Sequence, residues 1–205
     1  MLFGLGDGHI GKSLNDYLWG RCGIEETACD VSDYAGLTTG VGKLFVIPSS
    51  LNAGDIARVL RDGYDPALLN DGIRALIQRL SLDFLFIDTH PGVNEETLLS
   101  IAISDTLVIL LRPDQQDYQG TAVTVDLARR LGVPSMFIVV NKVLPLFDSA
   151  GVKEQAEKTF EAPVAGVLPL CEEMVRLGSS DLFCRRYSDH PFTQGVRQIF
   201  TRLVG

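Results

Sequence analysis

The sequence predicts an α/β fold with a mostly parallel sheet, because short apolar runs alternate with longer helical patterns along most of the chain. The apolar runs at residues 84–88, 106–111 and 136–140 each end at a polar residue. Strands buried on both faces of a parallel sheet have this nearly continuous apolar character. With 205 residues and no repeat or linker, the chain is predicted to form a single domain over residues 1–205.

The elements follow one another in β-then-α order from residue 41 onward. Strands are predicted at residues 44–48, 84–88, 106–111, 136–140 and 164–168. Helices are predicted at residues 55–61, 66–80, 94–104, 115–131, 153–160, 172–178 and 191–204, and Gly132 is a C-cap signal for the fourth of these. Repeated β-then-α order implies right-handed crossovers. Residues 1–40 are rich in glycine and acidic residues and contain no clear strand, so residues 41–205 are predicted to form the core.

Composition excludes several classes of protein. The net charge of -8 argues against direct nucleic-acid binding by the chain's own surface. No apolar run approaches the roughly 18–20 residues that a membrane-spanning helix needs. The cysteines form no CxxC pair, which fits reduced thiols in a cytoplasmic protein better than a disulfide framework or a zinc site. They are Cys22, Cys29, Cys171 and Cys184.

The apolar run at residues 82–88 ends on Asp88, and the chain then breaks at Pro91-Gly92. A carboxylate at the carboxyl end of a parallel strand lies at the rim where open α/β sheets bind ligands. Asp88 would hold a Mg²⁺ ion or its water there, which is the Walker B role in P-loop NTPases. The alternative is a buried strand whose aspartate only opens the turn.

Four segments, in order and spacing, resemble the MinD/ParA family of deviant-Walker P-loop ATPases. They are Phe86-Ile87-Asp88-Thr89-His90-Pro91-Gly92, residues 104–114, Val139-Val140-Asn141-Lys142 and Gly166-Val167-Leu168-Pro169-Leu170. The resemblance implies a three-layer α/β/α P-loop NTPase-like fold. Residues 14–31 also look like the family's segment between its second and third strands, well downstream of its phosphate loop. The first β-α-β unit is therefore expected to be missing from this chain.

The resemblance also assigns roles to particular residues. Asp88 becomes the catalytic residue and holds Mg²⁺ through water. A switch II-like loop follows it, formed by Thr89, His90, Pro91 and Gly92. Asn141 contacts the adenine edge, Lys142 packs its stem over the base, and Pro169 borders the base through its backbone. The plain alternatives are a turn-forming asparagine, a surface lysine and an exposed histidine.

Residues 6–13 match the Walker A pattern G-x-x-x-x-G-K-[ST], with Gly6, Gly11, Lys12 and Ser13 at the defining positions. Asp7 would put a carboxylate beside the phosphates, where charge repulsion is unfavourable. The family has a signature lysine where this chain has Asp7. The stretch of sequence between Lys12 and Asp88 is also shorter than in the family, by about one strand-helix unit. The favoured interpretation is a chance match in a loop, with the true phosphate loop upstream of Met1. The alternative is a compact, intact P-loop enzyme that uses Lys12 and Ser13.

The resemblance implies an ATP- and Mg²⁺-dependent switch for cell division, chromosome or plasmid partition, or polar placement. It implies a homodimer or association with a full-length relative, and weak ATPase activity if a functional phosphate loop is present. The alternative is a non-catalytic partner module or truncated remnant that binds no nucleotide by itself. The amphipathic pattern of residues 191–204 invites comparison with the membrane-targeting helix of MinD, but a helix packed on the sheet is favoured and membrane binding is not expected.

Overall fold

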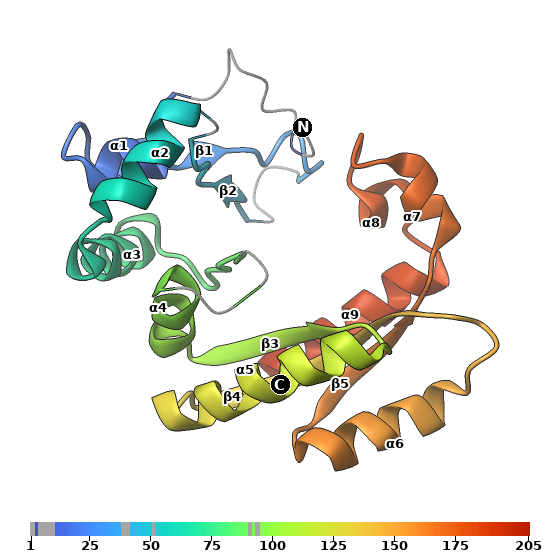
Figure 1. The fold of residues 1–205 in the computed structure, drawn as a ribbon. Helices are drawn as coiled ribbons and strands as arrows, with labels where there is room; N and C mark the ends of the chain where they lie inside the picture. The colour runs from blue at the N-terminus through green and yellow to red at the C-terminus, as the bar shows by residue number, and fades with distance from the viewer. Residues whose placement is uncertain (1–2, 4–10, 38–41, 51, 90–91, 93–94) are drawn as a thin grey trace. The chain divides into compact units, whose positions relative to one another are not determined.

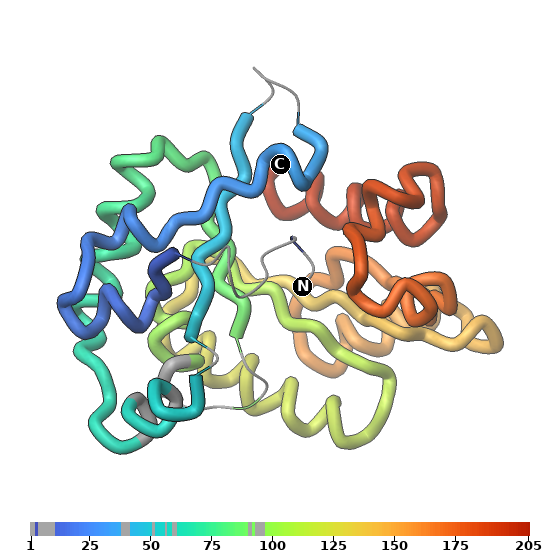
Figure 2. The backbone as a smooth tube through the Cα atoms, turned by 90° about the horizontal axis from the view of Figure 1, so that it is seen from above, coloured from blue at the N-terminus to red at the C-terminus, as the bar shows by residue number. Residues whose placement is uncertain are grey.

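The computed structural model describes residues 3, 11–37, 42–50, 52–89, 92 and 95–205. The chain, which can be followed in Figures 1 and 2, forms two compact units. The first unit is Met1–Phe86 with Ser179–Arg185, and the second is Ile87–Gly178 with Arg186–Gly205. Compactness alone does not show that a unit folds independently, so the single domain over residues 1–205 stays a prediction.

The second unit contains a parallel three-stranded sheet in the order β3-β4-β5. Its strands are β3 (Thr106–Leu111), β4 (Ser135–Val143) and β5 (Val164–Pro169). Helix α5 (Gln115–Leu131) connects β3 to β4, and α6 (Ser149–Phe160) connects β4 to β5. The predicted α/β class with a parallel sheet is therefore confirmed.

Helices cover both faces of this sheet (Figure 1). On one face, Ile138 and Val140 of β4 share a buried cluster with Val125 of α5 and Phe160 of α6. On the other face, α9 (Pro191–Val204) packs on β5. The apolar stripe of α9 therefore faces the sheet, as the sequence interpretation favoured. Among the described residues, no helix combines the length and the apolar character needed to cross a bilayer.

A β-bulge in β5 sets which of its residues face which helices. Ile138 pairs with Val164 and Val139 pairs with Gly166, so Ala165 is the extra residue on β5. The bulge lets Val164 join the cluster on the α5 and α6 side while Gly166 lies against α9. Arg202 of α9 donates to the carbonyl oxygen of Ala165 at 3.0 Å, so the disrupted ladder is satisfied from α9.

The first unit has short elements at its start and two longer helices after them. They are α1 (Leu14–Leu18), the 3-10 helix η1 (Ile24–Thr27), β1 (Cys29–Asp30), β2 (Phe45–Val46), α2 (Ala53–Asp62) and α3 (Pro66–Leu80). β1 and β2 pair antiparallel, which the sequence did not predict. Helix α3 begins at the N-cap Asp65, whose side chain accepts from the amide of Ala67. The remaining helices are α4 (Glu95–Ile103), α7 (Glu172–Leu177) and α8 (Phe183–Arg186).

One predicted strand is wrong: described residues 84–88 form no strand. Phe84 is 54% exposed and Phe86 is 77% exposed. An apolar run forms a strand only where a neighbouring strand pairs with its backbone groups. Residues 82–89 join no ladder in the part of the chain that the structure describes. The boundary between the two compact units also falls within this segment, at Phe86.

Candidate functional site

The carboxyl ends of the three parallel strands form the candidate site. The register pairs Leu111 with Val140, and Val143 with Pro169. Asn141 and Lys142 follow Val140 directly, so they lie at the same sheet edge as Pro169. The structure therefore brings together the three residues that were predicted to border a nucleotide base, at the edge where open α/β sheets bind ligands.

An irregular turn of the backbone shapes this edge. The ladder between β4 and β5 shifts between Val140 and Val143, and Lys142 adopts a left-handed φ of 58°. The side-chain oxygen of Asn141 accepts the amide hydrogen of Lys142 at 2.8 Å. Asn141 therefore uses its oxygen locally and keeps its amide N–H groups as the donors for a ligand acceptor. Pro169 is exposed, and the amide of Leu170 donates to Val143 at 2.9 Å.

An ion pair that the sequence analysis did not predict lies at the end of β3. The guanidinium of Arg112 binds both carboxylate oxygens of Asp117, with Nε to Oδ2 at 2.9 Å and Nη2 to Oδ1 at 2.8 Å. The Arg112 backbone amide adds a third bond to Asp117, at 3.0 Å. These contacts hold the pKa of the Asp117 carboxyl below its usual range, chiefly through the side-chain hydrogen bond from Arg112. Arg112 is thereby held against the first turn of α5.

Replacing Asp117 with asparagine should lower the free energy of unfolding by about 1 kcal/mol at pH 7, because a partly exposed pair with added hydrogen bonds is lost. The pKa of Asp117 is lowered by folding, so its contribution is complete above the ordinary value of 3.8 and is lost as the pH falls through the lowered folded value. Urea unfolding from pH 7 to pH 3 should show the two proteins converging at the acid end. Asp126→Asn, which breaks the more exposed pair with Arg130, is the control and should change stability by less than about 0.5 kcal/mol.

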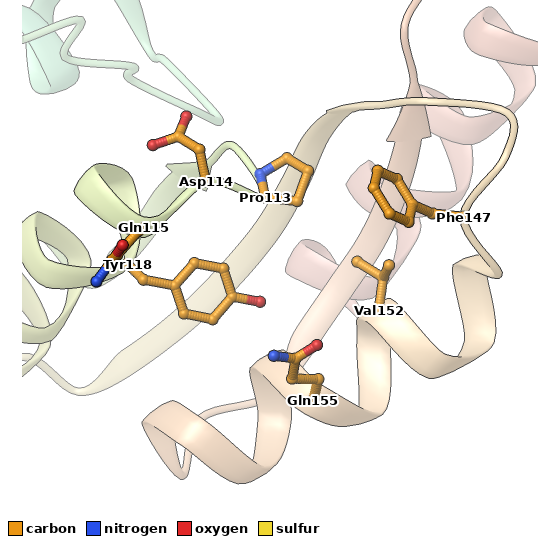
Figure 3. Close-up of a pocket in the computed structure, with 7 residues that line it drawn as sticks. All are labelled: Pro113, Asp114, Gln115, Tyr118, Phe147, Val152 and Gln155. Carbon is orange, nitrogen blue, oxygen red and sulfur yellow. The ribbon is translucent and has the colours of Figure 1, made fainter.

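A separate hollow of about 370 Å³ lies between the start of α5 and the start of α6 (Figure 3). Its lining is formed by Pro113, Asp114, Gln115, Tyr118, Phe147, Val152 and Gln155. The Tyr118 ring lies 5.3 Å from the Phe160 ring, and burial raises the pKa of the Tyr118 hydroxyl. Among the described residues, none that was predicted to bind nucleotide lines this hollow, so it is distinct from the contacts of Asn141.

Asp88 lies in an irregular segment instead of at the end of a strand. Asp88 and Thr89 are exposed, and Gly92 has a φ of 109°, which favours glycine. His90 and Pro91, the middle of the predicted switch II-like loop, lie outside the described residues. An exposed carboxylate has the right chemistry for Mg²⁺, and the metal role of Asp88 stays a prediction.

The Walker A match ends at the beginning of a five-residue helix. Ser13 is the N-cap of α1, and both its backbone amide and its hydroxyl donate to Asp16 Oδ2, at 3.0 and 2.9 Å. These hydrogen bonds lower the pKa of the Asp16 carboxyl, and the bond from the Ser13 backbone amide has the largest effect. A phosphate loop needs these donor groups for phosphate and metal. In this conformation both Ser13 donors are engaged by Asp16, and phosphate binding by Gly11, Lys12 and Ser13 stays a prediction. Gly11 and Lys12 are exposed, and Gly6 lies outside the described residues.

Comparison with known proteins gives a consistent picture. No protein-family model matches the chain. An uncharacterized ATP-binding protein of Methanocaldococcus jannaschii is 25% identical over 194 residues, which is 94% of this chain and 67% of the relative.

Solved structures of MinD and ParA proteins share the fold. The MinD cell division protein of Aquifex aeolicus has a TM-score of 0.77 at 17% identity, with 100% of this chain and 78% of that chain covered. The cell division ATPase MinD of Pyrococcus furiosus has a TM-score of 0.76 at 16% identity, covering 99% and 78%. A ParA family ATPase from Chlorobium tepidum has a TM-score of 0.69 at 15% identity, covering 99% and 78%. The resemblance carried by the four sequence motifs is therefore confirmed, and this chain has the fold of the MinD and ParA ATPases.

Proposed function

We propose that this chain is a MinD/ParA-like ATP-binding protein that acts as an ATP-dependent positioning or partition switch. The observation that carries the proposal is the meeting of Asn141, Lys142 and Pro169 at the carboxyl edge of the parallel sheet. The shared fold and the ATP-binding name of the archaeal relative support the same ligand. Cell division, partition or polar placement is the process expected for such a switch, in the cytoplasm.

The adenine would lie against the irregular end of β4, at Asn141 and Lys142. The amide N–H groups of Asn141 would donate to a ring nitrogen of the base, and the Lys142 stem would cover the ring. Asp88 would hold Mg²⁺ through water, and residues 89–92 would respond to the terminal phosphate. Because Asp16 engages both Ser13 donors in the described conformation, weak ATP hydrolysis is proposed only if a functional phosphate loop is present.

A non-catalytic partner module is the second candidate function. The side of β3 that faces away from β4 favours it. Within the described residues β3 pairs only with β4, so its other edge has no strand beside it. Leu110 on β3 is 66% exposed. An unpaired edge with an exposed aliphatic side chain is a surface that another strand can extend. A second copy of this chain or a full-length relative would supply that strand.

Calorimetric titration of the folded chain with ATP and Mg²⁺ tests the proposed function. We expect saturable binding, and about a tenfold weaker Kd for Asn141→Ala because one buried hydrogen bond to the base is lost. Asn52→Ala, which removes an asparagine from a loop of the first unit, should leave the Kd unchanged.

Two other outcomes would support the alternative interpretations. Loss of binding in Lys12→Ala would identify residues 6–13 as the phosphate loop, since a lysine charge on the terminal phosphates carries much of the affinity. Absence of ATP binding by a chain that circular dichroism shows to be folded, together with stable association in sedimentation experiments, would support the partner module and reject the nucleotide switch.

A further inference from the structure

Three side chains with metal-binding atoms meet where the chain leaves β5. Cys171 and Glu173 stand at the junction between β5 and α7, and His190 stands at the start of α9. Each residue offers one ligand atom, and these three atoms lie within 4.8 Å of one another. They are the thiol sulfur, a carboxylate oxygen and an imidazole nitrogen. All three residues belong to the second compact unit. None of the three residues is among those proposed to bind the nucleotide.

The spacing of the ligand atoms suits a single ion. The Cys171 sulfur lies 3.5 Å from Glu173 Oε2, and the same oxygen lies 3.8 Å from His190 Nε2. In a tetrahedral site with a metal–sulfur bond of about 2.3 Å and metal–oxygen and metal–nitrogen bonds of about 2.0 Å, ligand atoms are roughly 3.3–3.5 Å apart. The two distances to the Glu173 oxygen are therefore within about 0.5 Å of those in such a site, and the Cys171 sulfur and a His190 ring nitrogen lie no more than 4.8 Å apart.

Local contacts orient each ligand. His190 Nδ1 accepts the amide hydrogen of Phe192 at 3.1 Å, which points Nε2 toward Glu173. The amide of His190 donates to the carbonyl oxygen of Tyr187, and their rings meet edge to face. Cys171 is buried, with 7% of its surface exposed, so its sulfur keeps a defined position. In the metal-free chain, backbone contacts therefore position His190 and burial positions Cys171.

We propose that Cys171, Glu173 and His190 bind one borderline-soft divalent cation of the Zn²⁺ class, with water as the fourth ligand. A thiolate and an imidazole select such an ion over Mg²⁺, which separates this site from the metal that accompanies ATP. The bound ion ties the segment after β5 to the start of α9, two segments separated by α7 and α8 in sequence.

Binding of the metal ion releases a proton from the protein and changes no oxidation state. The Cys171 thiol loses its proton to solvent when the metal–sulfur bond forms. For Nε2 to bind the ion, the imidazole proton must lie on Nδ1, so the hydrogen bond from the Phe192 amide to Nδ1 is given up when the metal binds. One proton is released for each ion that binds.

Titration of the untagged, nucleotide-free chain with Co²⁺ tests the proposal, because a thiolate ligand gives a sulfur-to-cobalt charge-transfer band in the near ultraviolet. We expect a band that saturates at one ion per chain and disappears when Zn²⁺ is added. Cys171→Ser should abolish the band, and Cys184→Ser, at an exposed cysteine outside the cluster, should retain it.

A second variant distinguishes the role of His190 as a metal ligand from its role as the N-cap of α9. His190→Asn keeps a good N-cap residue for α9 but removes the imidazole, so it should stay folded and bind Co²⁺ at least tenfold more weakly. Glu173→Gln should also weaken binding and remove the rise in Tm that Zn²⁺ gives the native chain. The proposal is overturned by the absence of the band, by its survival in Cys171→Ser, by its loss in Cys184→Ser, or by unchanged affinity in His190→Asn.

Discussion

Replacing Ile138 with alanine is expected to lower the free energy of unfolding by about 3–4 kcal/mol, because the side chain is completely buried at the centre of the sheet. Ile138 is 0% exposed and belongs to the cluster that joins β4 to α5 and α6. Removal of three carbon atoms there loses their transfer free energy and leaves a cavity that rigid strands on both sides cannot close. Urea unfolding followed by circular dichroism measures the change.

Val123→Ala serves as the matched control for this prediction. Val123 lies on α5 and is 53% exposed, so its truncation should change stability by less than about 0.5 kcal/mol. Equal losses for Ile138→Ala and Val123→Ala would show that the cluster between the sheet and its two crossover helices does not form in solution.

Replacing Gly166 with alanine is expected to cost about 2–3 kcal/mol, although only one methyl group is added. A Cβ atom at this position would lie 2.4 Å from Ile199 Cγ1 and 2.8 Å from Ile199 Cδ1. Ile199 is itself buried in the contact between α9 and β5. The helix would have to move away from the strand, and thermal unfolding should show a lower Tm.

The control is a glycine with open space around it. Gly120 lies in α5, and a Cβ added there meets nothing within 4 Å. Gly120→Ala should raise stability by about 0.5–1 kcal/mol, because alanine loses less backbone freedom on helix formation. Shortening Ile199 to alanine in the Gly166→Ala background should recover part of the loss, as a double-mutant cycle would show. A Gly166→Ala variant as stable as the native chain would contradict the close contact between α9 and β5.

Elements with strong local signals were predicted closely. The helices over residues 66–80, 115–131 and 191–204 have the same ends in the structure, and Gly132 terminates α5 with a left-handed φ of 72°. The strand at residues 106–111 also matches. In these segments the apolar periodicity, the capping residues and the tertiary contacts all favour one conformation, so local and global preferences agree.

The candidate site was predicted only in part. The resemblance assigned Asn141, Lys142 and Pro169 to the nucleotide base, and the register of the sheet puts the three at one edge, while their role in binding stays a prediction. The pairing of Arg112 with Asp117 was not predicted, because it depends on the angle at which α5 leaves β3. The meeting of Cys171 with His190 depends likewise on how α9 returns to the sheet.

The sequence by itself determined the alternation of strands and helices, the chain's motifs and the edge of the sheet that carries polar residues. These features depend on the order of residues along the chain and on the period of their apolar side chains. The tertiary structure decided whether residues 84–88 form a strand, because a strand exists only when a second backbone pairs with it. It also decided which distant side chains meet, since that depends on the packing of helices on each face of the sheet.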